Sequence, residues 1–206
     1  MRAGAAKPYR WRTSRARIAV LLAIALAACT SAPGLPAEIE VAQGELYEHP
    51  YTNLILPARA GIFVRESVTQ YDPDGFDFSG HYTSRMVGTT ATVYFYPGTN
   101  SPSLSKEEVA SHIDRVKADI MRLSPFARLL DQEAGEFTLG DVKKWGYHAR
   151  FELPSFRGVD EPIESHLYLF PVGQWFVKFR VSFPARDAEL ARPELGPLLA
   201  TSWWRH

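Results

Sequence analysis

The stretch WFVKFRVSF, residues 175–183, alternates so regularly that it decides the fold class. One phase of this stretch is apolar and consists of Trp175, Val177, Phe179, Val181 and Phe183, whereas the other phase holds Phe176, Lys178, Arg180 and Ser182. Successive side chains of a β-strand point to opposite faces of the sheet, so this alternation predicts an antiparallel strand with one buried face.

The segments on either side of this strand show the same period of two. KWGYHARFEL (144–153) alternates strongly, IESHLYLF (163–170) alternates more weakly, and TATVYFY (90–96) is rich in β-branched and aromatic residues. Nearer the amino end, GIFVRESVTQYD (61–72) and FDFSGHYTS (76–84) flank the turn residues Pro73-Asp74-Gly75 and predict a hairpin.

Two segments have the period of a helix instead. Residues 105–125 open with Ser105 and, three residues later, Glu108, which is the pattern of a capping box. A single apolar stripe then follows at steps of four and three, made of Val109, Ile113, Val116, Ile120 and Leu123. The tail 184–206 is expected to be partly helical, with Pro193 in a first turn and Leu195, Leu198, Leu199 and Trp203 docking inward.

Together these segments predict an α+β fold with an antiparallel sheet of about six or seven strands. One long amphipathic helix is expected to cover the apolar face of the sheet, and a C-terminal helical segment closes the chain. The layout, with a helix between two hairpin groups and a closing helix, is faintly similar to the PsbP/Mog1-like fold. No motif carries this resemblance, so it concerns the layout alone.

The amino end has the features of an export signal. Residues 1–17 contain six basic and no acidic side chains, and the uncharged run IAVLLAIALAA (18–28) follows them. This run is shorter than the ~20 residues that a membrane-spanning helix needs. A basic leader followed by a short apolar run and small residues is typical of a secretory signal peptide.

The four residues Leu26-Ala27-Ala28-Cys29 resemble the lipobox of bacterial lipoproteins, and Cys29 is the single cysteine of the chain. The resemblance implies cleavage between Ala28 and Cys29, a diacylglyceryl group on the Cys29 sulfur, and an acyl chain such as palmitate on the new amino terminus. Two or more acyl chains anchor a protein stably to a membrane. Because Thr30 stands where Asp tends to retain such proteins in the inner membrane, we expect an outer-membrane lipoprotein that faces the periplasm.

The sequence therefore predicts three regions: a signal peptide over 1–28, a lipidated cysteine and tether over 29–50, and a single α+β domain over 51–206. Without residues 1–28 the chain has 17 basic and 23 acidic side chains, a net charge of −6. Such an acidic chain is a poor candidate for nucleic-acid binding, which depends on Lys and Arg neutralising phosphates.

No sequence motif points to a particular chemistry. The closest two histidines are 18 residues apart, and we find neither a nucleophile elbow nor a phosphate or dinucleotide fingerprint. We therefore assign no catalytic residue, metal site or cofactor.

One set of polar residues remains as a possible binding face, since its members share the polar phase of their strands: Asp77, His81, His148, Arg150, His166 and Arg180, accompanied by Glu152, Glu164 and Lys178. The simpler interpretation is a solvated sheet face with cross-strand charge pairs. Aromatic residues on the same phase, among them Tyr94, Tyr96 and Phe176, indicate that part of this face is covered or binds a partner.

Two functions from different classes follow. The first is a non-catalytic envelope lipoprotein, held at the membrane by its lipid, that binds an envelope protein partner or a small ligand. The alternative is a hydrolase-like envelope enzyme that uses the His/Asp/Arg sheet face, for which His81, His148 and His166 would have to converge.

Overall fold

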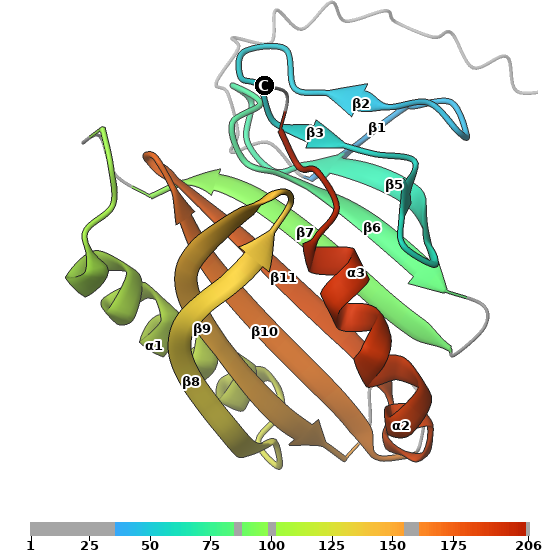
Figure 1. The fold of residues 1–206 in the computed structure, drawn as a ribbon, viewed down its shortest axis with the longest axis vertical. Helices are drawn as coiled ribbons and strands as arrows, with labels where there is room; N and C mark the ends of the chain where they lie inside the picture. Colours follow the sequence, from blue (N-terminus) through green and yellow to red (C-terminus); the bar gives the residue numbers. More distant parts are fainter. Residues whose placement is uncertain (1–35, 85–87, 99–101, 155–160, 205–206) are drawn as a thin grey trace, which may run out of the picture. The chain divides into compact units, whose positions relative to one another are not determined.

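The computed structural model describes residues 36–84, 88–98, 102–154 and 161–204, and these residues are built around an antiparallel sheet (Figure 1). The sheet has nine strands in the order β1-β5-β6-β7-β11-β10-β9-β8, with the short β4 also paired to β5. Their bounds are β1 Ala37–Ile39, β4 Arg59–Ala60, β5 Phe63–Gln70, β6 Phe78–Ser84, β7 Thr89–Pro97, β8 Arg128–Leu139, β9 Val142–Leu153, β10 Ile163–Val172 and β11 Trp175–Pro184. A separate two-stranded sheet pairs β2 (Tyr47–Glu48) with β3 (Ile55–Leu56).

The α+β class is confirmed, but the expected six or seven strands are too few. Strands β5, β6, β7, β9, β10 and β11 occupy the segments that the alternation identified. Sequence reasoning missed β8, an edge strand whose many exposed polar side chains, such as Asp131, Glu133 and Glu136, hide any period of two. It left a short strand within residues 30–50 open but did not locate the very short strands before residue 61.

Part of the stretch expected to be a tether is folded. Strand β1 pairs with β5, β2 pairs with β3, and His49 between them is buried. The described fold therefore extends to the amino-terminal side of residue 51. The expected signal peptide, Ala28 and Cys29 lie outside the described residues.

Helix α1 (Lys106–Leu123) follows the predicted capping box closely. The Glu108 backbone N–H donates to Ser105 Oγ at 3.1 Å, and the Ser105 N–H donates to the Glu108 carboxylate at 2.7 Å. Val109, Ile113 and Ile120 are buried as the stripe predicts. Leu123 departs from that prediction because it ends the helix with 76% of its surface exposed.

The C-terminal segment is a series of short helical turns, as expected in outline. It comprises the 3-10 turns η1 (Ala185–Asp187) and η2 (Arg192–Glu194) and the short helices α2 (Ala188–Ala191) and α3 (Leu195–Leu199). Leu195, Leu198, Leu199 and Trp203 are all buried. None of the helices in the described part of the chain has the length and apolarity needed to cross a bilayer.

The two helical segments cover opposite faces of the sheet (Figure 1). Strand register explains this arrangement, since Leu167 of β10 lies opposite Arg180 of β11, and His166 lies opposite Val181. The apolar phase of β9 and β10 therefore faces α1, whereas the apolar phase of β11, β7 and β6 faces the C-terminal segment and β3. We call these two sides the α1 face and the C-terminal face.

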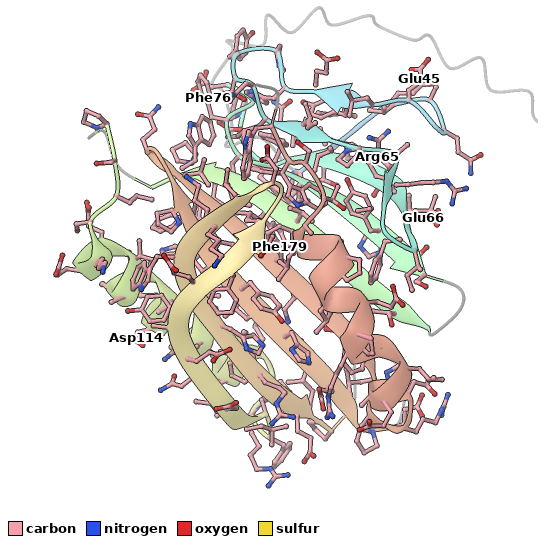
Figure 2. The ribbon with its side chains drawn as sticks, viewed as in Figure 1. Glu45, Arg65, Glu66, Phe76, Asp114 and Phe179 are labelled. Carbon is pink, nitrogen blue, oxygen red and sulfur yellow. The ribbon has the colours of Figure 1, made fainter. Side chains whose placement is uncertain are left out.

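This finding corrects the prediction of one apolar face under the helix and one polar face opposite it. Each face carries both an apolar region and a polar region. The largest contacts of the C-terminal face are aromatic, because the Trp203 ring packs edge-on against Tyr82 and Phe179, with centroids 5.9 and 5.3 Å apart. Figure 2 labels Phe179 among the side chains that fill this layer.

We predict that Trp203→Ala destabilises the protein by about 3–5 kcal/mol, because it leaves a cavity beneath the C-terminal segment. A urea titration followed by circular dichroism measures the change. Leu190→Ala, in the same segment but 67% exposed, is the control and is expected to change stability by less than ~0.5 kcal/mol. Equal effects of the two changes would contradict the packing described here.

Candidate functional site

The predicted binding face is divided between the two sides of the sheet. His148, Arg150 and His166 lie on the C-terminal face. His81 and Arg180 lie on the α1 face. Residues directly opposite each other on neighbouring strands share a face, and the row of opposite residues across the sheet is Ala149, Leu167, Arg180, Thr92 and His81. The remaining member, Asp77, lines a cavity on the α1 face together with Lys178. The three histidines of the enzyme hypothesis therefore do not converge.

On the C-terminal face the polar residues form a continuous hydrogen-bonded chain, which we call the histidine chain. His148 Nε2 lies 2.9 Å from His166 Nδ1, and His166 Nε2 lies 2.8 Å from the Glu164 carboxylate. Arg192 of η2 completes it by donating to both Glu164 oxygens, at 2.8 and 2.7 Å. The outer nitrogen of His148 lies 3.5 Å from Glu133 of β8.

The pKa values of the histidine chain follow from burial and from these contacts. Burial lowers the pKa of His166 to about 4, although the hydrogen bond to Glu164 opposes the shift. Burial alone would raise the pKa of Glu164, but hydrogen bonds from Arg192 and His166 lower it to about 2. At neutral pH the chain is therefore a neutral histidine pair beside a carboxylate that Arg192 compensates.

The histidine chain consequently has the properties of a structural contact that holds the C-terminal segment on the sheet. Its polar atoms form hydrogen bonds with one another, and Glu164 and His166 are buried. Arg192 was not among the candidate residues, because a single arginine in a helical tail gives no signal in the sequence. Within the described residues, no group of three or more His, Cys, Asp or Glu side chains is arranged to hold a metal ion.

We predict that stability falls as the pH is lowered from about 6.5 to about 4. Burial lowers the pKa of both His148 and His166 below the value of 6.5 for a free histidine. In this window the unfolded chain binds more protons than the folded chain, so stability is lost as the pH falls. His166→Gln is expected to flatten the slope in urea titrations at several pH values, with a residual slope from His112, whose pKa burial lowers to about 4.

The matched control is His81→Gln, which removes a histidine from the opposite face of the sheet. This variant tests whether the slope depends on the histidine chain in particular or on any histidine of the sheet. An unchanged slope in His166→Gln would mean that the histidine chain does not set the acid sensitivity.

The α1 face contains an open cavity of about 290 Å³ beside the helix, which we call the tyrosine cavity. Strand β7 contributes Tyr94 and Tyr96, β11 contributes Lys178, and the connection from β5 to β6 contributes Tyr71 and Asp77. Helix α1 supplies His112, Val116 and Asp119 on the remaining side. The cavity exists because α1 covers the apolar half of this face and leaves the polar half beside it uncovered.

Lys178 is one of the charged groups that line the tyrosine cavity. Its ammonium nitrogen lies 4.1 Å from the centroid of the Tyr94 ring and 5.2 Å from that of Tyr96, so the two rings stabilise the charge by cation–π attraction. Burial lowers the pKa of Lys178 to about 8. Burial also raises the pKa of Asp77, an effect that Asp72 strengthens and Lys178 opposes.

The walls of the tyrosine cavity are held firmly. The Tyr96 hydroxyl is 2.7 Å from His112 Nε2, and the His112 ring stacks on Phe176 with centroids 4.1 Å apart. On the other side the Tyr71 hydroxyl is 2.9 Å from Ser79 Oγ. A cavity with rigid aromatic walls and a few polar groups is the usual form of a small-molecule site.

Arg180 lies two residues along β11 from Lys178. Its side chain is held by a hydrogen bond in which Arg180 Nε donates to Ser165 Oγ of β10 at 2.6 Å. Sequence reasoning placed Lys178 on the polar phase and noted Tyr94 and Tyr96 as surplus aromatic residues. It gave no means of joining these residues to Asp77 and α1.

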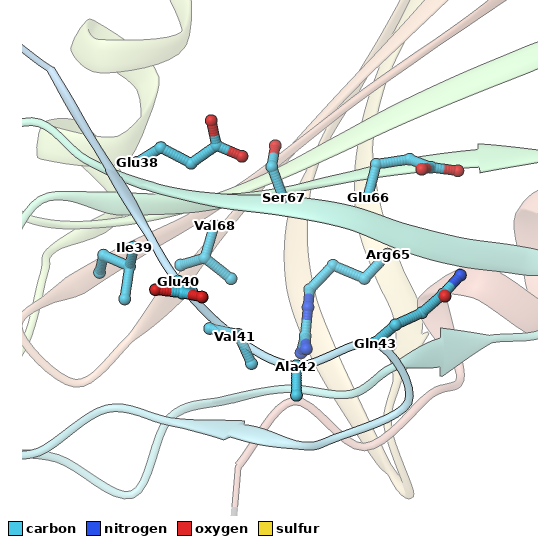
Figure 3. Close-up of a pocket in the computed structure, with 10 residues that line it drawn as sticks. All are labelled: Glu38, Ile39, Glu40, Val41, Ala42, Gln43, Arg65, Glu66, Ser67 and Val68. Atoms are coloured by element: carbon cyan, nitrogen blue, oxygen red, sulfur yellow. The ribbon is translucent and has the colours of Figure 1, made fainter.

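A second cavity, of about 340 Å³, lies between β5 and the segment that follows β1 (Figure 3). Figure 3 shows the Arg65 side chain extending from β5 toward the loop at Ala42. This guanidinium donates to the backbone carbonyls of Leu56 and Glu45, so its hydrogen bonds serve the fold. The tyrosine cavity is therefore the stronger candidate site.

Comparison with known proteins gives no matching family model and no matching curated relative.

Proposed function

We propose that this chain is a lipid-anchored lipoprotein of the bacterial envelope whose folded domain binds a small ligand without catalysing a reaction. The observation that carries the binding role is the tyrosine cavity, an open hollow with aromatic walls and charged side chains directed at it. The anchoring role rests on the leader and on Leu26-Ala27-Ala28-Cys29, which resemble the signal and lipobox of bacterial lipoproteins.

The arrangement of the histidines favours binding over the enzyme alternative. A catalytic acid–base pair must reach a substrate, and it works best with a pKa near the operating pH. His166 is buried, is bonded through both ring nitrogens, and has a pKa of about 4. His81 is on the opposite face of the sheet, so His81, His148 and His166 do not form one cluster that could act in hydrolysis.

We place the protein at the outer membrane, facing the periplasm, with its lipid as the membrane contact. The six acidic charges in excess on the chain after Ala28 repel anionic lipid headgroups, so the acyl chains would have to hold it there. The position of Thr30 after the cysteine is the reason for preferring the outer membrane.

We predict that the protein extracted from membranes begins at Cys29 and carries added acyl mass, which intact-protein mass spectrometry measures. Cys29→Ser is expected to release the protein from the membrane fraction, because no lipid is then attached. A Cys29→Ser protein that is still cleaved and still fractionates with membranes would contradict lipid anchoring.

The binding role is tested by filling the cavity. Val116 lines it from α1, so Val116→Trp, and the smaller change Val116→Phe, are expected to abolish stabilisation of the full chain by ligands from a collection of amino acids, organic acids, amines and sugars. Thermal unfolding with and without each compound measures the effect, and unfolding without compound checks that each variant is folded.

Leu123→Trp, on the same helix but exposed, is the matched control and is expected to respond like the unmodified protein. If no compound stabilises the unmodified protein, or if the filled variants respond equally well, the cavity is not a binding site.

A further inference from the structure

Two charged side chains that line the tyrosine cavity attract each other, and Lys178 also contacts the rings of Tyr94 and Tyr96, but neither charge is held in an ion pair among the described residues. Asp77 and Lys178 both face the cavity, yet neither forms an ion pair, and neither charged group takes part in a hydrogen bond within the described part of the chain. Elsewhere the buried charges are satisfied: Glu164 accepts from Arg192 and His166, and Arg65 donates to two carbonyls.

The lack of an ion pair or hydrogen bond at these two charged groups has a cost. Burial disfavours the charged form of each group, since it lowers the pKa of Lys178 and raises that of Asp77. A partly buried charge is normally compensated by a partner of opposite sign with hydrogen bonds to it. A bound molecule that supplies both partners would remove the cost at both residues.

The signs of the surrounding charges restrict the ligand. A simple anion attracted to Lys178 would also meet the carboxylates of Asp77 and Asp119, and a simple cation attracted to Asp77 would meet Lys178 with Arg180 behind it. A molecule that carries one charge of each sign avoids both repulsions. Charge-assisted hydrogen bonds at each end are about twice as strong as neutral ones, which favours a zwitterion over a neutral polyhydroxyl compound.

We propose that the tyrosine cavity binds a small zwitterion of the amino-acid type, with its carboxylate on the Lys178 ammonium and its ammonium group on the Asp77 carboxylate. The side chain of the ligand lies against the rings of Tyr71 and Tyr94 and against Val116. This assignment rests on the proposed ligand-binding function and adds the chemical class of the ligand.

The ligand class is tested with three probes of the same ring that differ in one charge at a time. L-phenylalanine carries both charges, hydrocinnamate lacks the ammonium group, and phenethylamine lacks the carboxylate. Calorimetric titration of the full chain in detergent is expected to give L-phenylalanine an affinity at least about tenfold higher than either analogue, the value of one charged hydrogen bond.

Two variants assign each charge to its residue. Asp77→Asn is expected to remove the preference for L-phenylalanine over hydrocinnamate, and Lys178→Gln is expected to remove its preference over phenethylamine. The matched controls are Asp74→Asn, in the same turn but exposed, and Lys143→Gln, on the exposed part of β9. Both controls are expected to keep the preferences of the unmodified protein.

The outcomes separate this assignment from the proposed function. Equal or tighter binding of hydrocinnamate, phenethylamine or glucose, lost in Val116→Trp, would overturn the zwitterion and keep the cavity as a binding site. Binding of L-phenylalanine that survives Asp77→Asn and Lys178→Gln unchanged would also overturn it. Failure of every compound in the wider collection would remove the proposed function itself.

Discussion

The register between β10 and β11 is the constraint on which the rest of the structure depends. At several positions of this pair an apolar residue of one strand stands opposite a polar residue of the other, as in Leu167 with Arg180 and His166 with Val181. Neither face can then be left to solvent, because each carries part of the apolar surface. Helix α1 covers one half and the C-terminal segment, with β3, covers the other.

The same constraint creates two polar regions, and the chain treats them differently. On the C-terminal face Arg192 closes the region by pairing with the buried Glu164 carboxylate. On the α1 face the helix runs over β9 and β10 and leaves Lys178 beside an open hollow. A covered and satisfied cluster stabilises a fold, whereas an open and unsatisfied one is suited to binding.

The sequence predicts the local elements of this fold well. Alternation locates six of the seven long strands, at β5, β6, β7, β9, β10 and β11, and the capping box locates α1. These signals are local, and each one is carried by residues a few positions apart. The edge strand β8 is not predicted, because most of its side chains are exposed on both faces. Its sequence therefore shows no alternation of polar and apolar residues.

The candidate site is only partly predictable for a related reason. The period of two predicts that His148 and Lys178 belong to the polar phase of their strands. It does not predict on which face of the sheet the polar phase of each strand lies. That choice is made by pairing across the sheet, which brings Tyr94 to Lys178 and separates His81 from His166. The prediction that all polar phases share one face of the sheet is wrong for β10 and β11, because their polar phases lie on opposite faces.

The contrast between the two polar regions also gives a reason for a lysine at position 178, in the interior of a strand. A leucine or valine at this position would extend the apolar phase of β10 onto β11 and let α1 pack over a wider area. The lysine instead costs desolvation, which its pKa of about 8 reflects, and the rings of Tyr94 and Tyr96 offset only part of that cost. Departures from the best packing are expected where a protein meets a ligand. The open part of the α1 face is such a departure. The packed C-terminal face on the other side of the sheet supplies the stability that this part of the fold lacks.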